Sequence, residues 1–156
     1  MNKLLLALTV TLVPAAQAAA FLVTVNTSSI NPLLGNLALD YSTQNAQSSF
    51  AAITGFTGAT LGAALPPLGT VSGGLPTNNL VITATNPGSN YAIGANFNNN
   101  SFSFLLSLYG PAVDTPNSGA GGTTFSVQMY DATFSNGLLT QDGVVGLIDI
   151  DRKSVV

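Results

Sequence analysis

Short runs in which apolar and polar residues alternate recur along this chain, and they limit its fold more than any other feature. A period of two places one set of side chains on each face of an extended strand, as in a sheet with one buried and one solvated face. Turn residues such as Gly, Pro and Asn interrupt the runs at short intervals. The apolar sets of the clearest runs are Phe21/Val23/Val25, Leu37/Leu39/Tyr41, Leu80/Ile82/Ala84, Phe102/Phe104/Leu106/Leu108 and Phe125/Val127/Met129.

These runs predict an all-β fold, an antiparallel β-sandwich or jelly-roll-like single domain of roughly eight to ten strands. The strands that contain Phe104 and Val127 are predicted to be central in the core. The 156 residues, less an export signal, supply one domain with a sizeable core. One alternative stays open for residues 43–52, where Gln44, Ala46 and Gln47 would tolerate a short helix.

The N-terminus has the three parts of a secretory signal peptide. Lys3 precedes an apolar run over residues 4–13, and Pro14 and a series of small residues follow. We therefore predict a signal peptide over residues 1–18, cleaved after Ala18, and a β-sandwich domain over residues 19–150. A transmembrane anchor is the alternative, but the apolar run is shorter than the ~20 residues that span a bilayer. The chain has no Cys, which favours a bacterial envelope or extracellular setting over a eukaryotic one.

The chain is almost uncharged, and this excludes several classes of function. Only 6% of its residues are charged, against about 25% in typical soluble domains. Between Leu4 and Asp151 there is no Lys, Arg, His, Cys, Glu or Trp. Nucleic acid is therefore not a predicted partner, because neutralising phosphates takes several Lys or Arg residues. The residues that most enzymes use for acid–base, nucleophilic or metal chemistry are nearly absent, so we predict no catalytic activity.

The aspartates are the candidate metal ligands. Asp131, Asp142 and Asp149, together with Asp151, would suit a hard cation such as Ca²⁺, which takes six to eight oxygen ligands. No recognised calcium-loop spacing frames them, and Asp149 and Asp151 lie next to Arg152 and Lys153, as at a solvated strand end. We predict no cofactor, with Ca²⁺ as the alternative.

Sugar binding is the more specific of two hypotheses for the polar tract near residue 98. Asn98 and Asn99 lie beside Tyr91 and Phe97 in the sequence, and amides next to aromatic rings are typical of sugar sites in β-sandwich modules. The alternative is a turn, because Asn favours left-handed and Asx-turn conformations. Two further aromatic residues, Tyr109 and Tyr130, are predicted to lie on the polar faces of neighbouring strands, as a stabilising cross-strand pair or a binding platform.

Four segments carry a family resemblance: Phe21 to Ser29, Phe102 to Ala112, Thr124 to Ala132 and the closing Leu147 to Asp151. They resemble secreted bacterial PEP-CTERM proteins of a family with no assigned activity. The resemblance implies export and sorting at the envelope through a C-terminal Pro-Glu-Pro motif, a transmembrane helix and a basic tail. It implies a surface or extracellular-matrix role and supplies no catalytic residues.

The end of the chain departs from that family pattern. The sequence printed stops at Val156 without the Pro-Glu-Pro motif or an apolar span. Residues 151–156 read as a non-native or truncated tail, and we expect the native protein to continue with one more strand and the sorting signal. Membrane contact would come only through that missing anchor.

Together these features predict a non-catalytic, exported protein of the cell surface or a biofilm matrix, with a structural or adhesive role. Its expected partners are polysaccharides or other surface and matrix proteins. Two alternatives stay open. One is a carbohydrate-binding β-sandwich module. The other is a fibre-forming subunit that assembles by strand addition, since the strands carry almost no Lys or Glu to repel a neighbour.

Overall fold

The computed structural model confirms the all-β sandwich. It describes residues 8–15, 18–44, 46–77, 79–84, 88–115 and 121–150. Within these ranges the elements, in chain order, are β1 (Leu8–Ala15), β2 (Ala18–Asn26), β3 (Leu33–Thr43), β4 (Phe50–Thr57), β5 (Thr60–Ala64), β6 (Thr70–Ser72), β7 (Leu80–Thr83), β8 (Ser89–Phe97), β9 (Ser101–Tyr109), α1 (Pro111–Asp114), β10 (Thr123–Asp131) and β11 (Val144–Ile150).

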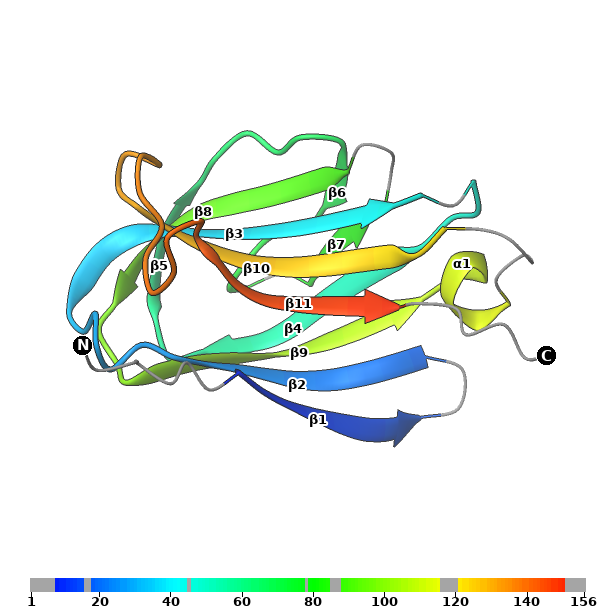
Figure 1. Cartoon of the computed structure of the whole chain (residues 1–156), viewed down its shortest axis with the longest axis horizontal. Helices are drawn as coiled ribbons and strands as arrows, with labels where there is room; N and C mark the ends of the chain where they lie inside the picture. The colour runs from blue at the N-terminus through cyan, green and yellow to red at the C-terminus, as the bar shows by residue number, and fades with distance from the viewer. Residues whose placement is uncertain are drawn as a thin grey trace.

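Two antiparallel sheets pack face to face (Figure 1). Sheet A has the strand order β1-β2-β9-β4-β7-β6, and sheet B has the order β11-β10-β3-β8-β5. Strands β5 and β6 therefore end the two sheets on one side of the sandwich, and β1 and β11 end them on the other. The segment between β10 and β11 projects at one end, and α1 lies at the opposite end (Figure 1).

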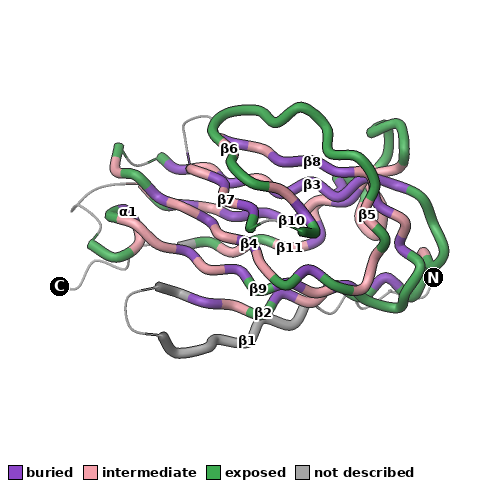
Figure 2. Tube along the Cα trace, turned by 180° about the vertical axis from the view of Figure 1, so that it is seen from behind, coloured by how far each residue is buried: buried purple, intermediate pink, exposed green. Residues whose placement is uncertain are grey.

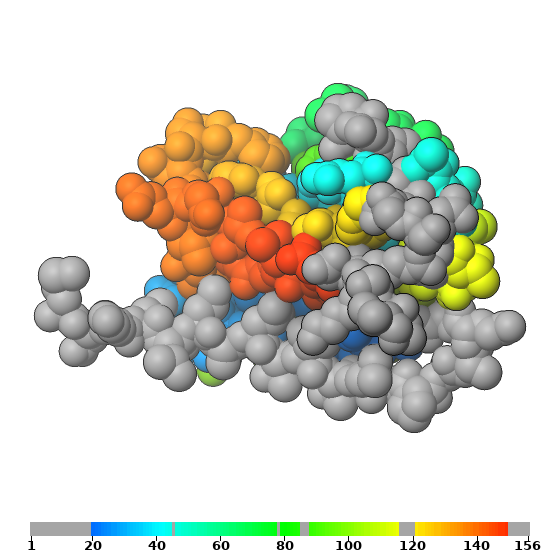
Figure 3. Space-filling model, turned by 45° about the vertical axis from the view of Figure 1, so that its right-hand side comes forward, coloured from blue at the N-terminus to red at the C-terminus, as the bar shows by residue number. Residues whose placement is uncertain are grey.

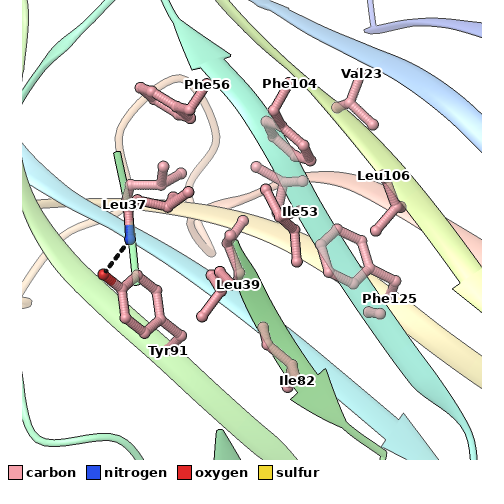
Figure 4. Packing of buried hydrophobic residues seen from close by; sticks show 14 of the residues in the cluster. Val23, Leu37, Leu39, Ile53, Phe56, Ile82, Tyr91, Phe104, Leu106 and Phe125 are labelled. Atoms are coloured by element: carbon pink, nitrogen blue, oxygen red, sulfur yellow. Dashed lines mark hydrogen bonds between the residues drawn. The ribbon is translucent and has the colours of Figure 1, made fainter. Parts of the chain in front are cut away.

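The alternation read from the sequence correctly predicts the core. Phe104, Leu106, Leu39 and Phe125 are fully buried, and the other apolar residues that the alternation assigned to the inner faces of β3, β7, β9 and β10 are buried too. Figure 4 shows side chains from both sheets meeting between the layers. Figure 2 shows the same pattern along the trace, with buried and partly exposed residues alternating in the central strands. Burying large apolar side chains is the main stabilising contribution in a chain without disulfides.

Aromatic rings fill one end of this core. The ring centroids of Phe56 and Phe102 lie 5.6 Å apart, and those of Phe102 and Phe104 lie 6.5 Å apart. Phe97 reaches Phe102 from the opposite sheet at 6.0 Å. Because Phe97 comes from β8 in sheet B and Phe102 from β9 in sheet A, these contacts tie the two sheets together.

The structure corrects the helix considered for residues 43–52. β3 continues to Thr43 and β4 begins at Phe50, with a loop between them. The loop's carbonyl groups bond outside the segment: Ser48 accepts from the Ala112 N–H at 3.1 Å, and Ser49 accepts from the Ala84 N–H at 2.8 Å. These tertiary hydrogen bonds outweigh the weak local helix preference.

Strand β1 lies within the predicted leader. Its backbone pairs with β2 from Leu8↔Val25 to Ala15↔Ala18, and it forms the outer edge of sheet A. Residues 1–7 of the predicted leader and the predicted tail, residues 151–156, lie outside the described residues. Within the described residues, no helix is long and apolar enough to cross a membrane.

Candidate functional site

Two of the predicted sugar-binding aromatics lie inside the core. Tyr91 and Phe97 point inward from β8, and both are buried. The Tyr91 hydroxyl accepts a hydrogen bond from the backbone N–H of Leu75 at 3.1 Å, which satisfies its polar atom within the protein (Figure 4). Their placement does not fit contact with a surface ligand. The physical reason is the strand period: β8 extends through Phe97, so the ring falls on the same inward face as Tyr91.

The predicted pairing of Tyr109 with Tyr130 is wrong. Tyr109 belongs to β9 in sheet A, and Tyr130 belongs to β10 in sheet B. The chain crosses from sheet A to sheet B between β9 and β10, by way of α1. The sequence did not reveal this crossing. Tyr109 stacks on Phe50 with ring centroids 5.3 Å apart, and Tyr130 packs beside Phe134 at 5.6 Å. Both tyrosines are partly exposed, on opposite faces of the molecule.

The predicted asparagines lie in the turn between β8 and β9. Asn98 and Asn99 are exposed. The Asn98 side-chain amide donates to the Thr60 hydroxyl at 3.1 Å, and the Asn99 carbonyl accepts from the Thr27 hydroxyl at 2.7 Å. These bonds hold the turn against β5 and against the residue that follows β2, so this geometry favours the turn interpretation over a dedicated sugar site.

Asp131 anchors the loop between β10 and β11. Its Oδ1 accepts from the Thr133 hydroxyl at 2.8 Å and from the backbone N–H groups of Ser135 and Thr133 at 2.9 and 3.0 Å. Its Oδ2 accepts from the Asn136 side-chain amide at 2.7 Å. These hydrogen bonds favour the charged carboxylate and lower the pKa of Asp131 to about 2. The hydrogen bond from Asn136 has the largest effect.

The other two predicted metal ligands are also bound locally. Asp142 accepts from the Val144 N–H at 3.1 Å, and Asp149 accepts from the Thr124 hydroxyl at 2.7 Å. In the part of the chain that the structure describes, no three His, Cys, Asp or Glu side chains gather where they would hold a metal ion. The structure thus places Asp131, Asp142 and Asp149 at separate points of sheet B and its loop.

A groove of about 500 Å³ lies on the outer face of sheet B, and the sequence did not reveal it. It crosses the outward positions of β3, β5 and β8 and reaches the loop after β10. Its lining is mostly small: Gly62, Gly94, Ala95 and Ala132 are among the wall and floor residues. The full lining is Leu34, Gly35, Asn36, Thr60, Leu61, Gly62, Gly94, Ala95, Asn96 and Ala132.

The irregular pairing of β5 produces this groove. β5 pairs with β8 at Thr60↔Asn96 and Leu61↔Ala95, and the register then shifts before Ala64↔Ile93. The shift lies next to Gly94, whose missing side chain leaves the floor open. A Cβ built there would meet nothing closer than the Ala63 carbonyl oxygen at 3.8 Å. A bulge beside a glycine is a common way to open a sheet surface near a site.

Amide groups supply the polar part of the groove. The side chain of Asn36 donates to the Asp131 carbonyl at 2.8 Å. The Oδ1 atom of Asn96 is buried and has no hydrogen-bond partner among the described residues. An unpaired buried acceptor costs about 1–3 kcal/mol. The outward alternation of β8 was the available signal for Asn96, since residues 92, 94 and 96 fall opposite the core face.

One aromatic residue, Tyr130, neighbours a residue of the groove, and a second, Phe134, packs against Tyr130. Tyr130 is the cross-strand neighbour of Asn36 on the same outer face, and Phe134 follows in the loop, 41% exposed. That loop projects from the body in Figure 3, coloured orange. Gly143 lets the ring of Tyr130 approach the loop: its φ is 81°, and a Cβ there would collide with Tyr130 Cε1.

Comparison with known proteins identifies no relative. No family model matches the chain, and neither the curated proteins nor the solved structures include a match.

Proposed function

We propose that this chain is an exported, non-catalytic β-sandwich with a structural or adhesive role at the bacterial cell surface or in an extracellular matrix. The leader-like N-terminus and the resemblance to PEP-CTERM proteins support export and a surface role. Among the described residues, the exposed ones include many Ser, Thr, Asn and Gln side chains and few charges, which suits a chain that works by contact.

The use of the carboxylates is the observation that carries this proposal. Asp131, Asp142 and Asp149 each accept hydrogen bonds from neighbouring backbone or hydroxyl groups. Asp114 accepts from the Gly110 N–H at 2.8 Å at the start of α1. A catalytic carboxylate needs access to substrate and a pKa suited to proton transfer. The aspartates named here hold turns, loops and strand pairs together.

Export is tested by expressing the whole chain in a bacterial host and fractionating the cells. We expect the protein outside the cytoplasm, with an N-terminus at Ala19 when its intact mass is measured. Leu6→Arg, which places a charge inside the apolar run of the leader, is the matched control and should keep the chain uncleaved in the cytoplasm. Uncleaved, cytoplasmic wild-type protein would contradict the proposal.

The groove on sheet B favours a second candidate function, saccharide binding. Asn36 and Asn96 line it, and Tyr130, the cross-strand neighbour of Asn36, packs against Phe134. Ligand sites use such combinations of polar and aromatic groups. A glycan array with purified protein, with and without Ca²⁺, tests it. We expect Phe134→Ala to abolish saturable binding and Tyr109→Ala, an aromatic change on the opposite sheet, to leave it unchanged. Equal loss in both variants would contradict a site at this groove.

A further inference from the structure

Strand β1 covers an edge that maturation would expose. β1 spans Leu8–Ala15, inside the predicted leader, and pairs with β2 along eight positions. On its other side β2 pairs with β9 from Ala19↔Leu108 to Asn26↔Ser101 without a register shift. Cleavage after Ala18 would remove β1 and leave β2 attached to β9. The backbone N–H and C=O groups that β2 directs toward β1 would then lose their partners.

We propose that a second copy of the mature chain takes the place of β1, pairing β2 against β2 in a closed two-fold dimer. The proposal rests on the export proposed above. An exposed strand edge is a template for pairing with another strand. Residues 19–26 contain no charged residue and no Pro, so they carry none of the usual features that block such pairing.

The sequence of β2 favours a second copy as the occupant. In the observed register, Val10 of β1 lies opposite Val23, and Thr11 lies opposite Leu22. A two-fold axis at Val23 would place Val23 of the second copy opposite Val23 and Thr24 of the second copy opposite Leu22. The β1 positions opposite Phe21, Val23 and Val25 then stay apolar, because Val25, Val23 and Phe21 of the second copy replace Leu12, Val10 and Leu8. Elsewhere Thr24 replaces Thr11, Leu22 replaces Thr9 and Asn26 replaces Val13.

The outer face of sheet A supports continuity across this dimer. Leu22 on β2 is 44% exposed, and its cross-strand neighbour Leu105 on β9 is 38% exposed. Pairing at the β2 edge would bring the Leu22 side chains of the two copies near the new axis and shield them in part. The same patch is used on both copies, so the contact is isologous and closes at two chains instead of growing into a fibre.

The first test compares two double variants of the exported protein. Because the axis at Val23 sets residue 22 opposite residue 24 of the other copy, Leu22→Lys with Thr24→Lys creates two like-charge pairs. Leu22→Lys with Thr24→Glu creates two opposite-charge pairs at the same positions. Sedimentation over a concentration series should show a dimer for wild type and for the Lys/Glu variant. The Lys/Lys variant should dissociate at a concentration about tenfold higher or more.

A cysteine cross-link tests the register without added charge. The chain has no native Cys, so copies carrying Leu22→Cys can be mixed with copies carrying Thr24→Cys. We expect a disulfide-linked dimer in the mixture under mild oxidation, because directly opposed strand residues come close enough to bridge. Leu105→Cys, on the neighbouring strand of the same face, is the control and should not cross-link with Thr24→Cys.

Several outcomes would overturn the dimer. They are a mature protein that retains residues 8–15, a wild-type monomer at all concentrations, open-ended filaments, or equal behaviour of the two charge variants with no cross-link. Protein that never leaves the cytoplasm would instead count against the proposed export. A cleaved, exported monomer would overturn only the pairing.

Discussion

The two sides of the sandwich differ in the strands that form their edges. On one side, β5 and β6 are short, β5 shifts its register, and the segment joining them contains Pro66 and Pro67 and is mostly exposed (Figure 2). On the other side, β2 pairs with β9 from Ala19 to Asn26 without a register shift, although β11 shifts its register once against β10. Short strands, bulges and prolines prevent another strand from pairing. The side with β5 and β6 is therefore blocked to strand addition and hollowed into a groove, whereas on the other side the proposed removal of β1 would leave β2 as a regular edge.

The edge formed by β5 and β6 should contribute little to the stability of the fold. Phe104 lies at the centre of the core and contacts Phe56, Phe102 and Phe125. We expect Phe104→Ala to lower the free energy of unfolding by about 3–5 kcal/mol. Val71→Ala, at a half-buried position of β6, should lower it by about 1 kcal/mol or less. Urea denaturation measures both, and a comparable loss in the two variants would show that the β6 edge is an integral part of the core.

The loop that leads into β11 depends on close packing at one glycine. Gly143 has a positive φ, and a side chain there would collide with the Tyr130 ring. Gly143→Ala should therefore destabilise the protein by about 2–4 kcal/mol, from backbone strain and the collision together. Gly55→Ala is the matched control: its φ is also positive, at 62°, but nothing lies within 4 Å of the added Cβ. It should cost only the strain, about 1–2 kcal/mol. Equal losses in thermal unfolding would mean that the Tyr130 ring moves aside freely.

Acid should weaken the loop before β11 through Asp131. The folded-state pKa of Asp131 is about 2, below the ordinary value of 3.8, so the unfolded chain binds the proton more tightly. The stabilising contribution is thus complete above about pH 4 and is lost as the pH falls toward 2. Asp131→Asn should remove this part of the pH dependence of the urea midpoint. Asp149→Asn, whose side chain also accepts a hydroxyl hydrogen bond, is the control. An unchanged acid profile in Asp131→Asn would contradict the role of these hydrogen bonds.

The core was readable from the sequence because it depends on a local rule. Alternation in β9 and β10 correctly identified Phe104 and Val127 as buried. The alternating pattern also predicts that Tyr91 and Phe97 point inward, but only if β8 is known to extend as far as Phe97. When a polar tract begins inside a strand, its composition alone suggests that the strand has already ended and a turn has begun.

The site was less readable because it depends on which strands are neighbours. The crossing from sheet A to sheet B between Tyr109 and Tyr130 follows from packing of distant segments, and so does the placement of Asn36 and Asn96 along one groove. The groove needs a register shift in β5 as well. No spacing within the sequence specifies these pairings, since a change of strand order leaves every local pattern intact.

Filling the groove should have the smallest effect on stability. The same change tests most directly whether the groove and the β2 edge act independently. Gly94→Val projects a side chain from the open floor, and a strand position suits a β-branched residue. The free energy of unfolding should change by less than about 0.5 kcal/mol. Saturable glycan binding, if it occurs at the groove, should nevertheless be abolished by Gly94→Val and retained in Ser103→Val on sheet A. Dimer formation at β2 should be unaffected, because the groove and the β2 edge lie on different sheets. A Gly94→Val variant that loses dimerisation while its melting curve stays unchanged would contradict this independence, since it would place self-association on the side with β5 and β6.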